Sequence, residues 1–506
     1  MSEAKQKKKI GFPTAFTVLF IVLVLAAILT YLIPAGSYER LSYDSESGIF
    51  IKTDHNDEET EVPATQEELD KLGITIPLEN FVNGDILKPV AIPGSYEQLE
   101  QQPQGLIPVL KGPIAGIGDT IGIIVFVLVL GGIIGLLNDT GTFDAGIAAL
   151  SRKTKGKEFL LVIIISTIIA IGGTTFGMAE ETIAFYPILM PIFIAMGYDA
   201  MVTIAAIYMG STIGTMFSTT NAFSVVIASN AAGINFKSGL TIRLISLIIA
   251  QIITLYYIYR YAKKVKDKPE LSIVADDMPR IKERFLKGYD PDNVVDFDWR
   301  KILMLVLFIG AFPIMIWGVS SQNWWFDEMS ALFLAVGIIC IALSGLGEKK
   351  GVASFLNGAA DLVSVALIIG VARGINLIMD DGMISDTLLY NASNIIKNMN
   401  GILFSSVQMV LFSFLGIFIP SSSGLATLSM PIVAPLADTV NIGRDVVVSA
   451  YNYGQGWMSF ITPTGLVLAT LEMVDVSYNK WLKFILPLMA IIGLFAIVML
   501  AIQTFI

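Results

Sequence analysis

The chain has 506 residues, of which 54% are hydrophobic and 15% are charged, and its mean hydropathy is +0.70. Soluble domains carry about 25% charged residues, so this composition excludes a soluble protein and predicts an integral membrane protein. Many of the acids behind the net charge of −10 cluster in one loop, residues 39–100, and no basic patch or motif indicates nucleic acid as a partner.

The chain opens with the basic stretch 5–9 and an apolar run, residues 12–33, which is too long for a secretory signal and lacks a small-residue cleavage site. We expect an uncleaved first helix with a cytoplasmic N-terminus, because basic flanks stay on the cytoplasmic side. Residues 34–104 then form an acidic extracytoplasmic insert, with a hairpin near 38–52 and a short helix at EELDKL. A helix over 116–137 returns to the basic residues 152–157.

The stretch GGTTFGMAEET, residues 172–182, lies between two apolar arms, 159–171 and 183–196, each short for a full span. Together they predict a re-entrant hairpin that opens on the cytoplasmic side, because polar backbone at membrane depth persists only inside protein or beside a water-filled cavity. Residues 199–234 then cross outward with a break at GSTIGTMFSTTN, residues 210–221, and residues 240–259 cross inward.

The second half repeats this plan. Spans are expected at 302–319, 330–346 and 362–379, followed by a hairpin over 402–436 with the tip PSSSGLAT and a span over 445–471 broken at GQGWMSFITPTG. The last helix, 481–506, leaves the C-terminus outside. We therefore divide the chain into a cytoplasmic N-terminus with the first helix (1–33), the insert (34–104), a first transport repeat (105–261), a cytoplasmic linker (262–300), two connecting helices (301–346) and a second transport repeat (347–506).

The two halves are related by sequence as well as by hydropathy. The segment that starts at Gly118 resembles the one that starts at Ala360, and aligning the two breaks pairs Ser218 with Thr462 and Thr220 with Thr464. The first copy begins with an inward helix and the second with an outward one. These are inverted-topology repeats, the arrangement of many secondary transporters. The fold class is therefore an all-α integral membrane protein with inverted repeats, each holding a re-entrant hairpin and a broken transmembrane helix.

The four polar breaks supply the candidate site residues. Helix N-termini attract carboxylates, whereas freed carbonyls and hydroxyls coordinate small cations. Substrate binding is assigned to Thr174, Thr175, Glu180, Glu181, Thr219, Thr220, Asn221, Ser422, Ser423, Gln455, Trp457 and Thr464. Coupling to Na⁺ or H⁺ is assigned to Glu180, Glu181, Gly210, Ser211, Ser421, Gly454 and Thr462. No cofactor and no other metal is expected.

Structural alternatives exist for each group. One glutamate could pair with Arg373 or lie exposed at the tip, and the small residues of 210–221 could serve only helix packing. Residues 421–427 could be an ordinary turn, and Asp119, Arg373 and Arg444 could be structural ion-pair residues. A membrane enzyme is not expected, because the chain has one histidine, His55, and one cysteine, Cys340; a carboxylate pair remains the one enzymatic alternative.

The motifs GGTTFGMAEETIAF, SSSGLATLSMPIVAPLAD and GQGWMSFITPTG resemble the YfcC family, within the group that contains the DcuC-type anaerobic C4-dicarboxylate carriers and the ion transporter superfamily. The resemblance covers nearly the whole chain. It departs at Gln455, where relatives often have an acid, and at Gly465, where they often have a serine. It implies an inner-membrane carrier of small organic solutes, with basic amino acids suspected for YfcC-like members, and a homodimer.

The substrate follows from charge. No lysine or arginine lies in the four breaks, while Glu180 and Glu181 do, so a cationic amino acid is favoured. Its carboxylate would meet a helix N-terminus and its side chain a glutamate. A C4-dicarboxylate or other carboxylate carried with Na⁺ or H⁺ is the alternative. A channel is disfavoured, because paired hairpins indicate alternating access.

Overall fold

The computed structural model describes residues 13–86, 88–143, 145–146, 157–286, 298–322, 324–397, 399 and 401–506. The basic stretches 5–9 and 152–156, from which the orientation of the first spans was predicted, lie outside these ranges. Within them, nine helices are long and apolar enough to cross a membrane: α1 (Ala15–Leu32), α5 (Ile121–Asp139), α7 (Glu158–Phe176), α12 (Leu240–Asp267), α14 (Trp299–Gln322), α15 (Phe326–Leu343), α17 (Val363–Asp381), α19 (Gly401–Phe418) and α23 (Tyr478–Phe505).

Shorter helices complete each repeat. The first repeat contains α4 (Leu106–Asp119), η1 (Glu180–Phe185), α8 (Tyr186–Ala195), α9 (Ala200–Ile204), η2 (Ala205–Met209), α10 (Gly210–Met216), η3 (Ala222–Val226) and α11 (Ile227–Ala231). The second contains α16 (Glu348–Ala360), α18 (Ser385–Ile396), α20 (Ser422–Thr439), α21 (Arg444–Ser459) and α22 (Val467–Met473). Between the repeats lie η4 (Pro269–Leu271) and α13 (Met278–Phe285).

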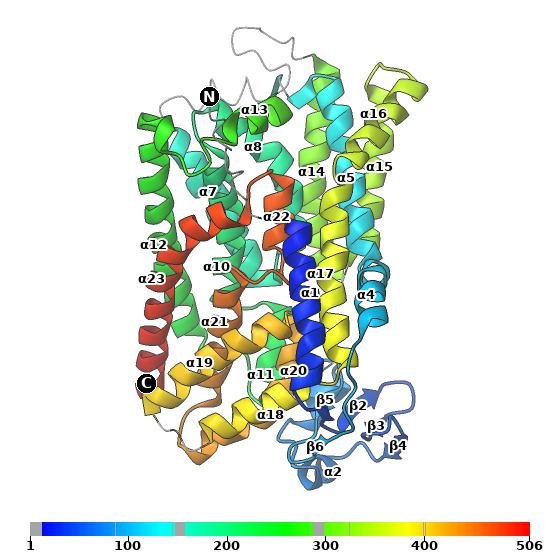
Figure 1. Cartoon of the computed structure of the whole chain (residues 1–506), viewed down its shortest axis with the longest axis vertical. Coiled ribbons are helices and arrows are strands. Elements are labelled where there is room, and N and C mark those ends of the chain that lie inside the picture. Colours follow the sequence, from blue (N-terminus) through cyan, green and yellow to red (C-terminus); the bar gives the residue numbers. More distant parts are fainter. Residues whose placement is uncertain are drawn as a thin grey trace, which may run out of the picture.

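The two repeats pack in a symmetric, crossed manner. Helix α4 packs on α17 as α5 packs on α16, and α7 packs on α10 as α19 packs on α21. The related helices α12 and α23 contact each other, as do α10 and α21. Figure 1 shows α7 and α8 in the upper half of the molecule and α19 and α20 in the lower half. The hairpins therefore enter from opposite ends, as inverted repeats require.

The insert folds as a small unit against the lower end of the helices (Figure 1). A four-stranded antiparallel sheet has the order β4 (Glu59–Val62), β3 (Ile49–Thr53), β2 (Arg40–Asp44) and β5 (Val90–Ala91), and a second pair joins β1 (Gly36–Ser37) to β6 (Glu97–Gln98). Helices α2 (Gln66–Lys71) and α3 (Leu78–Val82) lie between β4 and β5 in the chain, and Phe81 of α3 is in edge-to-face contact with Phe50 of β3. The hairpin and the EELDKL helix expected from the sequence are confirmed, whereas β4, β5 and α3 were not foreseen.

The irregular segments are shorter than the sequence indicated. Residues 210–216 are helical, so the first broken helix leaves helical geometry only at 217–221, and the second is irregular only at 460–466. Serine and threonine are tolerated there because their hydroxyls bond back to the preceding turn. Thr212 Oγ1 donates to the Tyr208 carbonyl at 2.8 Å, and Ser459 Oγ donates to that of Gln455 at 2.9 Å.

The helix expected over 116–137 is two helices, α4 and α5, separated at Thr120. Helix α4 begins at Leu106 and contains glycines that let it approach α17: a Cβ on Gly116 would lie 2.1 Å from the Gly370 carbonyl oxygen. The helices α16 and α18 were also missed, since their mixed polar and apolar sequences carry no strong membrane signal.

Candidate transport site

The first hairpin turns at Gly177–Ala179, after α7 ends. Gly177 has a positive φ of 76°, a conformation that favours glycine. The carboxylate Oε2 of Glu181 accepts a hydrogen bond from the Ala179 amide at 3.0 Å, and Ser211 Oγ donates to the Met178 carbonyl. The turn is thus stabilised by a residue of the hairpin itself, Glu181, and by Ser211 of the broken helix.

The first break, residues 217–221, is bonded to the end of α7. Thr174 Oγ1 accepts from the Thr219 amide at 2.9 Å and bonds to the Phe217 carbonyl at 3.2 Å. Asn221 Nδ2 donates to the Gly173 carbonyl at 3.2 Å. The sequence-predicted residues Thr174, Thr219 and Asn221 therefore lie together, and they satisfy backbone groups that the break leaves without helical partners.

The second hairpin has the same construction. Ser421 caps α20, its Oγ accepting from the Gly424 amide at 3.2 Å. Tyr451 donates to the Ser422 carbonyl at 2.5 Å, and Gln455 Nε2 donates to that of Pro420 at 3.3 Å. The tip is thus bonded to α21, the half of the broken helix that precedes the break.

The second break bonds to the end of α19. Thr464 Oγ1 donates to the Ile417 carbonyl at 3.0 Å and shares a 2.9 Å hydrogen bond with Thr462. Trp457 is not with them, because its Nε1 donates to the Met489 carbonyl on α23 at 2.8 Å. The structure therefore brings Thr462, Thr464 and Gln455 to the second hairpin and places the Trp457 indole against α23.

Two glycines assigned to ion coupling lie in close helix contacts. A Cβ on Gly210 would lie 2.8 Å from the Ser166 carbonyl oxygen, and one on Gly454 would lie 2.3 Å from that of Met409. Small-residue packing, the structural alternative stated for residues 210–221, thus accounts for these positions. A role of their carbonyls in ion binding stays a prediction.

Some candidate side chains form no hydrogen bond to another described segment. Thr175 bonds back to the Ile171 carbonyl at 2.6 Å, but Thr220, Ser422 and Ser423 form no side-chain hydrogen bond within the described ranges. Glu180 has neither an ion pair nor a hydrogen bond to another described residue, and Arg373, its suggested partner, pairs with Asp119 instead. A role of the Glu180 carboxylate and of these hydroxyls in binding a ligand stays a prediction.

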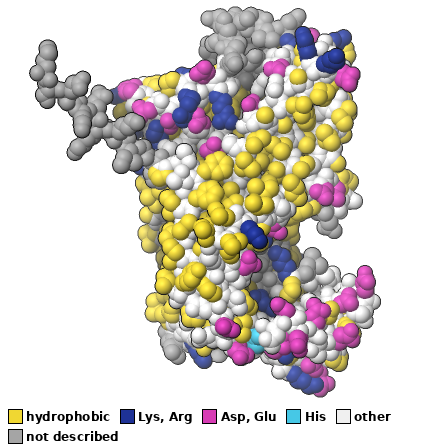
Figure 2. Space-filling model, turned by 45° about the vertical axis from the view of Figure 1, so that its right-hand side comes forward, with side chains coloured by type: hydrophobic (Ala, Val, Ile, Leu, Met, Phe, Trp, Pro, Cys, Tyr) yellow, Lys and Arg dark blue, Asp and Glu magenta, His cyan; other side chains and the backbone are white. Residues whose placement is uncertain are grey.

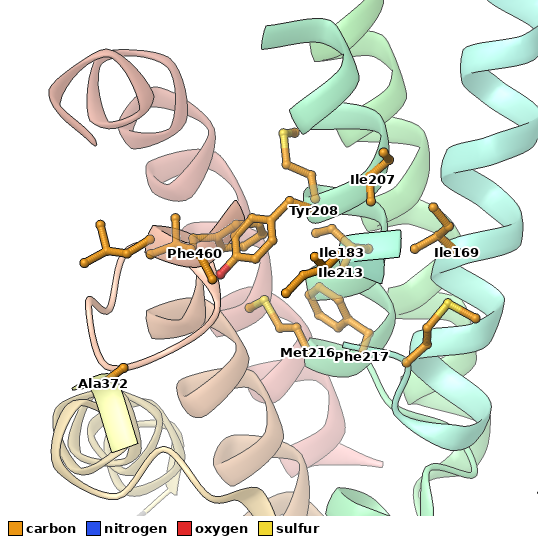
Figure 3. Packing of buried hydrophobic residues seen from close by; sticks show 14 of the residues in the cluster. Ile169, Ile183, Ile207, Tyr208, Ile213, Met216, Phe217, Ala372 and Phe460 are labelled. Atoms are coloured by element: carbon orange, nitrogen blue, oxygen red, sulfur yellow. The ribbon is translucent and has the colours of Figure 1, made fainter. Parts of the chain in front are cut away.

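An apolar layer lies between the two breaks in this conformation. Figure 3 shows Ile183 beside Ile213, with Met216 and Phe217 below them and Phe460 of the second break opposite. All five side chains are buried, and the hydroxyl of Tyr208 crosses the layer to donate to the Ser459 carbonyl at 2.6 Å. Buried apolar side chains therefore separate the two breaks in this conformation.

A cavity of about 380 Å³ lies at the second tip and continues to the insert. The second hairpin forms one wall, with Phe418, Ile419, Pro420, Ser421, Gly424 and Leu428. The rest of the lining comes from the insert, α17 and the segment that leads into α18: Gly36, Ser37, Arg40, Lys88, Arg373, Asn376, Asp380, Met383, Ser385 and Asp386. Figure 2 shows lysine and arginine side chains in the hollow between the insert and the helices.

Several of these cavity residues were missed by sequence reasoning. Arg373, Asn376 and Asp380 recur at helical spacing along α17, so this polar stripe was a readable signal inside an apolar span. Lys88 has no such signal, because only the fold of the insert brings it to the cavity.

The comparisons with known proteins now decide the class. Residues 12–505 match the family described as the C4-dicarboxylate anaerobic carrier family, DcuC. The chain belongs to the DcuC family. It is therefore a multi-pass membrane transporter of small solutes rather than an enzyme, as the composition and the paired hairpins predicted.

Two relatives align with this DcuC-family chain over nearly its whole length. An uncharacterized protein of Haemophilus influenzae is 48% identical over 503 residues, covering 99% of both chains. An Escherichia coli protein named "Putative basic amino acid antiporter YfcC" is 30% identical over 501 residues, covering 96% of this chain and 94% of its own. The resemblance to YfcC that the motifs indicated is confirmed.

Two solved structures also align along the chain. MtrF of Neisseria gonorrhoeae, reported with a class of antimetabolite efflux pumps, is 15% identical with a TM-score of 0.38, covering 98% of this chain and 96% of its own. The YdaH transporter of Alcanivorax borkumensis is 13% identical with a TM-score of 0.38, covering 97% of this chain and 98% of its own.

Proposed function

We propose that this transporter moves a basic amino acid across the cytoplasmic membrane by alternating access, either by exchange or coupled to Na⁺ or H⁺. The observation that carries the proposal is Glu180, a carboxylate at a hairpin tip with no cationic partner among the described residues. A second carboxylate, Glu181, adjoins it. Ionisable residues within the transmembrane segments of a protein usually mark substrate or ion pathways.

In this mechanism the two hairpins act as alternate gates. The substrate cation lies at Glu180, and its carboxylate lies at a helix N-terminus such as that of α20, whose amides at Ser422 and Ser423 donate no hydrogen bond to described residues. The hydroxyls and carbonyls of the breaks hold the coupling ion. Each tip is bonded to its own broken helix, so hairpin and broken helix would move together.

The proposed orientation follows the sequence. The N-terminus lies in the cytoplasm, and the insert and the C-terminus lie on the extracytoplasmic side. Figure 1 agrees with the second part of this orientation in placing the end of α23 in the lower half of the molecule, on the side where the insert lies. The transport repeats 105–261 and 347–506 would work as a pair within each protomer, in a homodimer.

Counterflow in proteoliposomes tests the substrate. Vesicles loaded with unlabelled arginine should accumulate labelled arginine, with and without Na⁺ being compared to identify the coupling ion. Replacing Glu180 by glutamine should abolish this uptake, and Glu181→Gln should reduce it, while the fold is retained. Glu79→Gln in α3 of the insert serves as the matched control, because it removes an acid away from the tips.

Two results would contradict this proposal. Unchanged arginine counterflow in both tip variants would remove the role of the glutamates. Accumulation driven by succinate alone, dependent on Na⁺, would favour the second candidate, a C4-dicarboxylate carrier. That candidate is supported by the family description and by the cationic residues Lys88 and Arg373 in the cavity.

A further inference from the structure

Among the described residues, one cation that lines the cavity at the second hairpin has no ion-pair partner. Arg40 pairs with Asp386 at 2.8 Å, and Arg373 pairs with Asp119. Lys88 forms no ion pair with a described residue, although it lines the same cavity. Lys88 and Arg373 line the same cavity, and desolvation and the positive charge of Arg373 lower the pKa of Lys88.

The buried wall of this cavity also holds an unsatisfied polar group. Asn376 is 6% exposed, and its Oδ1 has no hydrogen-bond partner. Buried amide oxygens are nearly always bonded, so this Oδ1 is an acceptor that a hydrogen-bond donor of a ligand can use. Across the cavity, Ser421 and Gly424 mark the N-terminus of the 18-residue helix α20, where partial positive charge favours an anion.

From these observations we propose that the insert and the second hairpin together form an extracytoplasmic capture site for the carboxylate group of the transported solute. Lys88 and the first turn of α20 attract the carboxylate, and Asn376 Oδ1 accepts a hydrogen bond from a donor elsewhere on the solute, such as the ammonium group of an amino acid. The site rests on the proposed function only in that the solute carries a carboxylate, as a basic amino acid and a C4-dicarboxylate both do. The insert then has a role in transport, because it supplies Lys88.

The exposed carboxylate of Asp380 separates the two solute classes. It lines the cavity one helical turn beyond Asn376. An amino acid would place its ammonium group near Asp380, whereas a dicarboxylate would meet repulsion there. Replacing Asp380 by asparagine should therefore weaken arginine binding and leave succinate binding unchanged or stronger.

Protection of Lys88 from chemical modification tests the capture site directly. The purified full chain, in detergent, is treated with an amine-reactive N-hydroxysuccinimide ester, and labelling is measured by mass spectrometry. Arginine or succinate should slow labelling of Lys88, whereas agmatine, which is arginine without its carboxylate, should not. Lys71, exposed on α2 and paired with Glu67, is the internal control and should label at the same rate throughout.

Transport with the Lys88→Gln variant gives a second measurement. Its affinity for external substrate should fall about fivefold, the effect of losing one solvent-accessible ionic contact, with the maximal rate little changed. Labelling that no carboxylate slows, or equal slowing by agmatine, would overturn the capture site even if arginine is transported. Protection by carboxylates in a chain that transports neither arginine nor succinate would instead retain the site and refute the proposed substrates.

Discussion

Asn221 holds the first broken helix to the first hairpin by donating to the carbonyl of Gly173 at 3.2 Å. In the second repeat, Thr464 donates to the carbonyl of Ile417 at 3.0 Å. Both repeats therefore fasten the break to a backbone carbonyl near the end of the first hairpin arm, in the last turns of α7 and α19.

Replacing Asn221 by alanine should destabilise the protein. Its Oδ1 also accepts from the Phe223 amide at 2.8 Å, capping the second half of the broken helix. Losing both hydrogen bonds at a buried position should cost about 2 kcal/mol. Thermal unfolding in detergent measures this loss of stability. The adjacent Thr220→Ala is the control, because Thr220 is exposed and its side chain forms no hydrogen bond with a described residue. Equal losses in both variants would contradict the assignment.

Much of this arrangement could be predicted from the sequence. The two hairpins, the two broken helices and their inverted relation follow from apolar arms around polar, glycine-rich stretches, which are costly in a membrane unless protein satisfies them. The contacts of single residues could not be predicted. Trp457 lies in the same motif as Gln455, yet its indole reaches α23 while the amide reaches the hairpin. Residues two positions apart on an α-helix do not share a face, and this separation was missed because residues 454–459 were expected to be irregular rather than helical.

The residues that line the cavity were even harder to predict from the sequence. Lys88 comes from the insert and Arg373 from α17, and only the folding of the insert onto the helices brings them together. No periodicity or motif connects residues so far apart in the chain. The breaks were also predicted too long, because serine, threonine and glycine stay helical where they pack closely.

Glycine at position 116 should be required for the α4–α17 contact. A Cβ there would meet the Gly370 carbonyl oxygen at 2.1 Å and the Gly374 amide nitrogen at 2.5 Å, both backbone atoms that cannot move aside. Gly116→Ala should therefore lower stability by about 2 kcal/mol or more. Gly118→Ala, on the same helix, meets nothing within 4 Å, and it should be neutral or stabilising by about 0.5–1 kcal/mol. The two melting temperatures should differ clearly; similar values would refute the close contact.

The contact between the insert and the helices should depend on Asp386. This buried carboxylate on α18 accepts from the Tyr38 amide at 2.8 Å and pairs with Arg40 at 2.8 Å. Asp386→Ala would leave both groups without their partner, so the start of the insert should detach more often. Limited proteolysis should then cut the insert several-fold faster than in the wild-type chain. Asp44→Ala, in the exposed hairpin of the insert, is the comparison, and faster cleavage there alone would contradict this role.

As the pH is raised, binding of an external carboxylate should begin to weaken at a lower pH than it would if Lys88 had the pKa of a free lysine. Because desolvation and Arg373 lower the pKa of Lys88, its ammonium loses the proton below the usual value of about 10.4. Attraction to a carboxylate is present below the lowered pKa and is lost as the pH rises through it. The charged groups that share the cavity with Lys88 are Arg40, Arg373, Asp380 and Asp386. Apparent affinity for external succinate, measured between about pH 8 and pH 10, should thus fall in the wild-type chain. In Lys88→Arg it should stay level, because a guanidinium remains protonated there; a parallel fall in both proteins would assign the titration to another group.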